Sequence, residues 1–254
     1  MLKLTRDFLN RGPFRFEDIQ VKYQENTPKT LRNYIYQGLE KGQLKTIKPG
    51  LYYVLPFGQT EDYVPDPFLI ASKLSEDAVI AYHGALALHG ATYSESKRIH
   101  FFTRKVTRKF EFKDYEFIPV QKKVDWGIET KTREGEVIQV TDRERTVLDN
   151  IDNVDYAGGF EELIKSIEVF PSVDLVKLES YLEKFGKQIL YAKTGFILEQ
   201  LKSHWNISEG LLKKLQKKVE GRSFYFEGKP IDGKLISRWN LVVPKKFELL
   251  LESA

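Results

Sequence analysis

Apolar residues at helical spacing, broken by short polar turns, predict two short helices at the start of the chain. Leu4 and Phe8 are four residues apart on one face of the first helix, which the Gly12-Pro13 pair ends. A second helix is expected at about 17–23. The polar residues 24–26 that follow it are typical of a tight turn before another helix.

A third predicted helix has two different faces. Thr27 is a good N-cap, and Pro28 suits the first turn because its missing N–H has no helical partner to lose, so this helix should run from there to Gly42. Its apolar residues repeat every four positions and predict a buried face: Leu31, Ile35 and Leu39. The remaining polar side chains are of the types that read base edges or contact phosphates, and the candidate DNA-binding residues are Thr27, Lys29, Thr30, Arg32, Asn33 and Gln37.

Two short strands, at 44–47 and 51–55, complete this N-terminal region. They flank Lys48-Pro49-Gly50 and predict a hairpin with a basic tip, which adds Lys45 and Lys48 to the candidate DNA-binding residues. The helix order and the hairpin predict a winged helix-turn-helix in residues 1–56. Such a domain places its third helix in the major groove of double-stranded DNA and its wing against the backbone or minor groove. A three-helix module that serves protein contacts is the alternative.

Beyond residue 56 the pattern predicts an α+β chain in three parts: a linker at 57–67, a mixed α/β domain at 68–141 and a mainly helical C-terminal region at 142–254. Residues 75–77 are expected to cap a helix from Ala78 to Leu88. Alternating apolar and polar residues then predict strands at 98–103, 109–112 and 116–120, and a hairpin at 127–140.

Helix caps organise the C-terminal region. The segment Thr141–Glu144 has the form of a capping box and opens a helix, on which Arg145 and Asp149 are expected to form a surface ion pair. Further helices are expected near 160–169, from a Ser172 cap to Gly186, at 187–204, and from a Ser208 cap to Gly221, with strand-like residues at 223–226 and 234–243.

Charge is unevenly distributed along the chain. Residues 1–56 contain ten Lys/Arg and five Asp/Glu, whereas the remaining 198 residues contain 30 basic and 31 acidic side chains. A basic N-terminal module on a nearly neutral body is the asymmetry expected when one end of a protein meets a polyanion.

Composition excludes several classes of protein. The chain has no cysteine, which excludes disulfides, zinc–thiolate sites, iron–sulfur clusters and thiolate nucleophiles. No apolar stretch is long enough for a membrane helix, and the N-terminal residues have no signal-peptide apolar region, so a cytoplasmic protein without membrane contact is expected. Walker-type and dinucleotide glycine motifs are absent, and no cofactor is predicted.

A metal-dependent nuclease is the alternative from another functional class. Asp114 followed by Glu129-Thr130-Lys131 in strand-like sequence imitates the two acids and a lysine that hold a divalent metal ion. Alternation on an exposed strand explains the same residues. His83 and His89 are six residues apart, about 120° around a helix, and so do not converge on one ion. The sequence therefore predicts no enzyme, no catalytic residues and no metal site.

Several segments in order resemble the AbiEi family of antitoxins and transcriptional regulators. They are the N-terminal region, Tyr82–Gly90, Val140–Asp149 and Gly158–Leu163. This resemblance covers roughly residues 1–200 and implies a repressor that binds its own promoter. It also implies an antitoxin of a type IV toxin–antitoxin system in phage defence, which counteracts a nucleotidyltransferase-like toxin without forming a stable complex with it.

Overall fold

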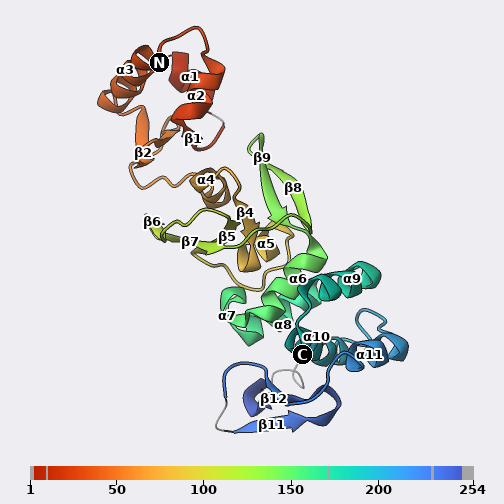
Figure 1. Ribbon diagram of the computed structural model, residues 1–254. Coiled ribbons are helices and arrows are strands. Elements are labelled where there is room, and N and C mark those ends of the chain that lie inside the picture. Colours follow the sequence, from red (N-terminus) through yellow and green to blue (C-terminus); the bar gives the residue numbers. More distant parts are fainter. Residues whose placement is uncertain (1–2, 10, 171, 230–231, 248–254) are drawn as a thin grey trace. The chain divides into compact units, whose positions relative to one another are not determined.

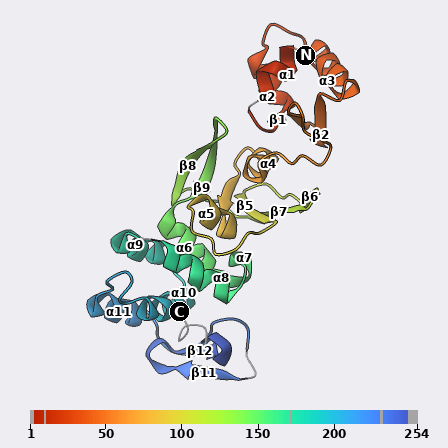
Figure 2. The ribbon, with the colours of Figure 1, turned by 180° about the vertical axis from the view of Figure 1, so that it is seen from behind.

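The computed structural model describes residues 3–9, 11–170, 172–229 and 232–247. The chain forms two compact units. The first unit comprises Met1–Ile80, Lys97–Val124 and Glu129–Val140, and the second comprises Ala81–Ser96, Asp125–Ile128 and Thr141–Ala254. Figures 1 and 2 show the elements of both units from opposite sides. The domain boundaries expected from the sequence stay a prediction.

The first unit begins with three helices and a small sheet. Its elements are α1 (Lys3–Phe8), β1 (Phe14–Arg15), α2 (Phe16–Lys22), α3 (Pro28–Glu40), β2 (Leu44–Lys48) and β3 (Leu51–Val54). The strand order is β1-β3-β2 with antiparallel pairing, so the β2–β3 hairpin has a third strand that the sequence pattern did not predict. The three helices and both hairpin strands lie where the apolar spacing predicted them. A single small core holds them together, formed by Leu4, Phe8, Phe14, Ile19, Tyr23, Leu31, Ile35, Leu44 and Val54.

Local chemistry explains where α3 begins and how it packs. The Thr27 hydroxyl accepts a hydrogen bond from the backbone N–H of Thr30 at 3.2 Å, and Pro28 follows as the first helical residue. Leu31 and Ile35 are buried as predicted. Gly38 is buried too, and a Cβ at this position would lie 2.6 Å from a methyl group of Leu44. Glycine therefore lets α3 approach β2 closely.

The rest of the first unit is built around a six-stranded mixed sheet. Its elements are α4 (Pro67–Leu74), β4 (Val79–Ala81), β5 (Arg98–Thr103), β6 (Phe110–Phe112), β7 (Tyr115–Gln121), β8 (Ile128–Arg133) and β9 (Glu136–Thr141), of which β4, β8 and β9 reach the second unit at one end. The strand order is β6-β7-β5-β4-β9-β8. Strands β5 and β7 run parallel, as do β4 and β9, whereas β6 and β7 are antiparallel. The strands predicted between residues 98 and 140 are confirmed within a few residues of the expected bounds.

Two expectations for residues 67–88 were wrong. Helix α4 was not predicted, although Asp66 caps it by accepting hydrogen bonds from the next two free N–H groups, at 2.8 and 3.2 Å. The helix expected from Ala78 begins only at Tyr82, because Val79–Ala81 is a fully buried strand between β5 and β9. Ser75 and Asp77 do not cap a helix and instead bond to Thr103, the last residue of β5, and to the backbone N–H of Arg104, which follows it.

The second unit is mainly helical. Its elements are α5 (Tyr82–Leu88), α6 (Arg143–Asp152), α7 (Val154–Ala157), α8 (Phe160–Val169), α9 (Leu175–Phe185), α10 (Gln188–Gln200), α11 (Glu209–Gln216), β10 (Phe224–Tyr225), β11 (Gly233–Ile236), a 3-10 turn (Ser237–Trp239) and β12 (Leu241–Pro244). Asp142 rather than Thr141 is the N-cap of α6, and Asp174 rather than Ser172 is the N-cap of α9. Ser208 caps α11 as predicted. A carboxylate at the N-cap adds a favourable charge to the cap hydrogen bond.

The C-terminal part of this unit packs onto α10. The strand order of the small sheet is β10-β12-β11, and the fully buried Trp239 lies at Gly195 in the middle of α10. Trp239 also donates its indole N–H to Glu199 at 2.8 Å. Among the residues that the structure describes, no helix is long and apolar enough to cross a membrane.

Candidate nucleic-acid interface

The polar face of α3 is free to meet a ligand. Lys29, Arg32, Asn33 and Gln37 are all exposed, on the side of the helix opposite Leu31 and Ile35. The Arg32 guanidinium lies 5.3 Å from the centre of the Phe16 ring, which holds its stem against α2 while its hydrogen-bond donors face solvent. The face therefore combines two cations with two side-chain amides, the groups that contact phosphates and base edges.

Two candidate residues have a structural role in the helix start. The Thr27 and Thr30 hydroxyls lie 3.0 Å apart, and the Thr27 oxygen also accepts the Thr30 N–H. Both side chains are therefore engaged in the cap. Because Pro28 has no N–H and the Thr30 N–H is donated to Thr27, this helix terminus does not offer the set of free backbone N–H groups that suits a phosphate.

The two lysines of the hairpin are engaged within the protein. Lys45 Nζ lies 2.6 Å from a carboxylate oxygen of Glu61, in the segment that follows the hairpin. Lys48 is the last residue of β2, and its ammonium lies 5.7 Å from the centre of the Phe110 ring on β6. Burial, and then the charge of Arg15, lower the pKa of Lys48. The basic tip of the hairpin stays a prediction, and the structure adds that Lys48 is half-buried with its side chain against an aromatic residue of β6.

A second group of cations was missed by the sequence argument. Residues 97–123, which we call the basic segment, contain nine Lys/Arg and only three Asp/Glu. Lys105 pairs with Glu76 at 3.0 Å and Arg98 with Glu116 at 3.0 Å. Three exposed cations form no ion pair among the described residues: Arg104, Arg108 and Lys113.

This basic segment continues the charge of the hairpin. The hydrogen bond from Lys45 lowers the pKa of Glu61, and the nearby charge of Lys113 lowers it further. Lys113 is in the turn between β6 and β7, and Phe110 of β6 carries the Lys48 contact. The first unit thus has cations on α3, on the hairpin and on the β6 edge of its large sheet. A count over short windows of the sequence would have found the last group.

The structure does not bring the candidate nuclease residues together. Asp114 lies in the β6–β7 turn at one edge of the six-stranded sheet, and Glu129 lies on β8 at the opposite edge. Lys131 is 3.3 Å from Glu129 on the same strand, in the alternation that explained these residues without a metal ion. Within the described part of the chain, no group of three His, Asp or Glu side chains is arranged to hold a metal ion.

The segments that carry the AbiEi resemblance outside the N-terminal region pack together in the second unit. His89, the C-cap of α5, lies with Nε2 2.8 Å from the carbonyl oxygen of Thr141, and His83 of α5 lies with Nε2 3.2 Å from Glu162 of α8. Glu162 also accepts hydrogen bonds from the backbone N–H groups of Tyr93 and Ser94. Burial raises the pKa of this carboxyl, but the hydrogen bonds outweigh burial and lower it.

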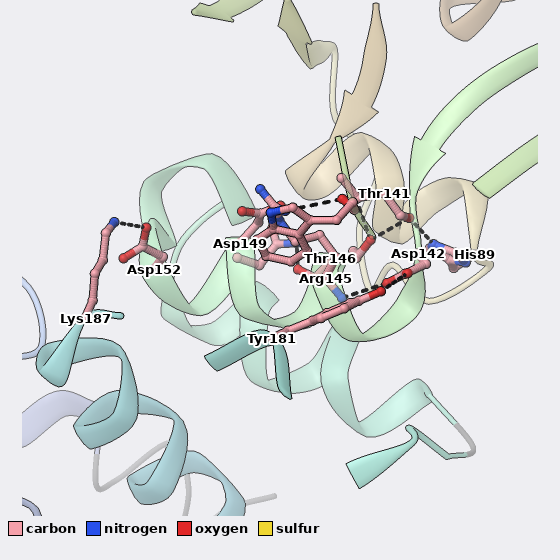
Figure 3. Close-up of polar contacts among 11 residues, drawn as sticks. His89, Thr141, Asp142, Arg145, Thr146, Asp149, Asp152, Tyr181 and Lys187 are labelled. Carbon is pink, nitrogen blue, oxygen red and sulfur yellow. Dashed lines mark hydrogen bonds and ion pairs between the residues drawn. The ribbon is translucent and has the colours of Figure 1, made fainter. Parts of the chain in front are cut away.

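Arg145 and Asp149 are not the surface pair that was expected. Both side chains are 1% exposed, and Arg145 Nε lies 2.8 Å from an Asp149 oxygen (Figure 3). The guanidinium carbon lies 3.8 Å from the centre of the Trp126 ring and 4.9 Å from that of Phe185. Close by, Tyr181 donates its hydroxyl to Asp142 at 2.8 Å. The cluster is a packed and hydrogen-bonded core rather than an open site.

These features define a mixed α+β protein with an exposed cationic and amide-bearing helix in one unit and a polar helical core in the other. No family model matches the chain, and no curated protein matches it. Among solved structures it is similar to the crystal structure of the RV2827C protein from Mycobacterium tuberculosis, with a TM-score of 0.64 and 13% sequence identity over 100% of this chain and 95% of that one. At this identity the likeness shows the fold.

Proposed function

We propose that this protein is a DNA-binding transcriptional repressor whose residues 1–56 act as a winged helix-turn-helix. The observation that carries the proposal is the exposed face of α3, where Lys29, Arg32, Asn33 and Gln37 stand opposite a buried apolar face on a helix with a defined N-terminal cap. The preceding α2 and the following β2–β3 hairpin complete the order of elements typical of that domain.

In this proposal α3 enters the major groove. Asn33 and Gln37 are one helical turn apart, so both amides reach neighbouring base edges, where an amide pairs well with adenine. Lys29 and Arg32 contact phosphates and fix the register of the helix. Because Lys45 and Lys48 are already engaged, the exposed cations of the basic segment, Arg108 and Lys113 among them, supply additional backbone contacts.

Binding to the protein's own promoter tests this function. Fluorescence anisotropy with promoter DNA and random DNA should show that Asn33→Ala and Gln37→Ala each lower the preference for promoter DNA by about 1–3 kcal/mol. Gln216→Ala is the matched control, since Gln216 is also an exposed helical glutamine but lies in the second unit. Equal losses on both DNAs, or losses as large for Gln216→Ala, contradict the assignment of the reading face.

The salt dependence tests the phosphate contacts separately. About five neutralised phosphates give a slope of about −4 to −5 for log affinity against log salt concentration. Arg108→Gln and Lys113→Gln should each reduce the size of that slope by about 1 while leaving the promoter preference unchanged. A slope that is unaffected by both changes would restrict the interface to the N-terminal region.

We further propose that the second unit acts as an antitoxin against a nucleotidyltransferase-like toxin encoded beside the gene, without forming a stable complex. The support is the resemblance of three segments to the AbiEi family together with their packing around Glu162, His83 and Thr141. The full-length double variant Asn33→Ala/Gln37→Ala should lose repression yet still protect cells that express the toxin. Loss of protection by this variant, with its fold intact, contradicts a protective role that is independent of DNA binding.

A further inference from the structure

A cavity of about 470 Å³ lies in the first unit, away from the exposed face of α3. Its walls come from three separate stretches of chain: the end of α1 with β1, the middle of α2, and a junction between α4 and β9. A volume in this range is typical of sites for small ligands. None of the candidate DNA-binding residues of α3 or of the hairpin lines it.

The base of the cavity is apolar. Phe8 and Phe14 line it with their rings 4.3 Å apart between centres and tilted by 35°. Val21 of α2 forms part of the wall and is 70% exposed. Val21 thus adds accessible apolar surface to this wall, against which an apolar ligand group can pack.

The rim of the cavity is cationic. Arg11 is exposed and forms no ion pair within the described residues. The Lys22 ammonium lies 5.3 Å from the Phe8 ring centre. It also lies 3.9 Å from an Asp7 carboxylate oxygen, which makes a weak surface ion pair. Lys73 is different, because it lies 3.3 Å from Asp18 and 3.2 Å from Glu136, and these two carboxylates already neutralise it.

We propose that this cavity binds a small apolar carboxylate, with its hydrocarbon part over Phe8, Phe14 and Val21 and its charge at Arg11 and Lys22. Of the three cations of the lining, Lys73 is neutralised and Lys22 is weakly paired, so Arg11 is the cation best placed to bind a single negative charge, which suits a monoanion. A phosphate dianion or a nucleic-acid backbone would leave the apolar base unused and would meet Asp18 and Glu136. The arginine fork can bind both oxygens of a carboxylate. This site does not depend on the proposed DNA binding.

The probe is phenylacetate, and phenylacetamide is its neutral counterpart of nearly the same shape. Each is titrated into the full-length protein and followed by the backbone amide resonances of residues 8–22. A ligand of this size binds weakly, in the millimolar range, which this method measures. Phenylacetate should bind saturably and at least about tenfold more tightly than phenylacetamide.

Three variants locate the site. Arg11→Gln should weaken phenylacetate about tenfold and leave phenylacetamide unchanged, because it removes the charge and not the apolar surface. Val21→Trp should abolish binding of both compounds by filling the wall. Val176→Trp is its matched control, since Val176 is also an exposed helical valine, 79% exposed, in the second unit.

The proposal fails if phenylacetate gives no saturable shifts, if the amide binds as tightly as the acid, or if Arg11→Gln leaves the acid affinity unchanged. Arg11 is exposed, so its variant tests the site even if Val21→Trp disturbs the fold. Loss of phenylacetate binding in Val176→Trp would also overturn the assignment, because it would place the binding outside the cavity.

Discussion

Replacing Asp149 by alanine should strongly destabilise the second unit. Asp149 is the carboxylate that faces the Arg145 guanidinium, and both side chains are 1% exposed. The substitution leaves a buried cation whose neighbours include the aromatic rings of Trp126 and Phe185 and the Trp126 carbonyl oxygen, 3.4 Å from Nη1. The cost of breaking a buried pair from one side is about 3–5 kcal/mol, because the surviving charge stays in a poorly solvating environment.

The matched control is a pair with the same spacing on the surface of the same unit. Glu161 and Lys165 are also four residues apart on a helix, at 2.9 Å, with side chains 54% and 34% exposed. Glu161→Ala should cost only about 0.3–0.5 kcal/mol, since water solvates the lysine that remains. Both pairs join opposite charges at the same spacing, so we attribute most of the roughly tenfold difference between the two substitutions to burial.

Urea denaturation followed by tryptophan fluorescence measures both variants. All three tryptophans, Trp126, Trp205 and Trp239, belong to the second unit, so the signal reports its unfolding. With an m-value of about 2 kcal/mol/M, a loss of about 3–5 kcal/mol lowers the midpoint by about 1.5–2.5 M. The double variant Arg145→Met/Asp149→Leu should recover most of this loss, because it removes both charges and keeps the apolar stem over Trp126. A loss below about 1 kcal/mol for Asp149→Ala, or no recovery in the double variant, would refute the reasoning.

Three further outcomes are expected. Glu61→Gln should raise the affinity for random DNA about two- to fivefold at low salt, because it frees Lys45 from its ion pair. The control Glu220→Gln, at another exposed glutamate, should leave the affinity unchanged. If anisotropy titrations of Glu61→Gln also show no change, Lys45 does not face DNA. Burial raises the pKa of Asp77, but hydrogen bonds from Ser75, from the Arg104 N–H and from Thr103 outweigh it and lower the pKa to about 2. The unfolded chain therefore binds this proton first as pH falls, so stability present above about pH 4 should be lost towards pH 2, and Asp77→Asn should flatten that part of a pH–denaturation profile. Gly195→Ala should destabilise the second unit by about 1–3 kcal/mol or more, because a Cβ there collides with the fully buried Trp239 ring. A melting temperature equal to that of the unchanged protein would contradict this packing.

The elements that the sequence predicted well are those with local signals. Helix α3 has a Thr-Pro start, a four-residue apolar repeat and a glycine soon after its end, and all of these act within about 15 residues. Strand β5 was predicted with its observed bounds because alternation and length both indicated a strand. Strand β4 was taken for part of a helix, because a short apolar run that is buried on both sides has no period that distinguishes the two.

The predicted site residues divide in the same way. Helical geometry places Lys29, Arg32, Asn33 and Gln37 on the exposed side of α3, and the four-residue apolar repeat of the sequence was enough to predict it. Lys45 forms its ion pair with Glu61, which is 16 residues away, and Lys48 contacts Phe110, which is 62 residues away. No local sequence pattern indicates either contact. The burial of Arg145 likewise depends on the approach of Trp126 from outside its helix.

Charge separates the two units more sharply than the net charge of the chain suggests. Residues 57–254 are nearly neutral because the basic segment and residues 184–254, which contain 14 Lys/Arg and seven Asp/Glu, offset acidic stretches. The most acidic of these is 142–183, with eleven Asp/Glu and only four Lys/Arg. Helices α6–α9 lie in this acidic stretch and belong to the second unit, whereas α3, the hairpin and the basic segment belong to the first. A surface rich in carboxylates is repelled by the phosphate backbone of DNA. In the proposed function we therefore expect DNA to contact the first unit and not helices α6–α9, and substitutions in the first unit should leave the fold and any separate activity of the second unit intact.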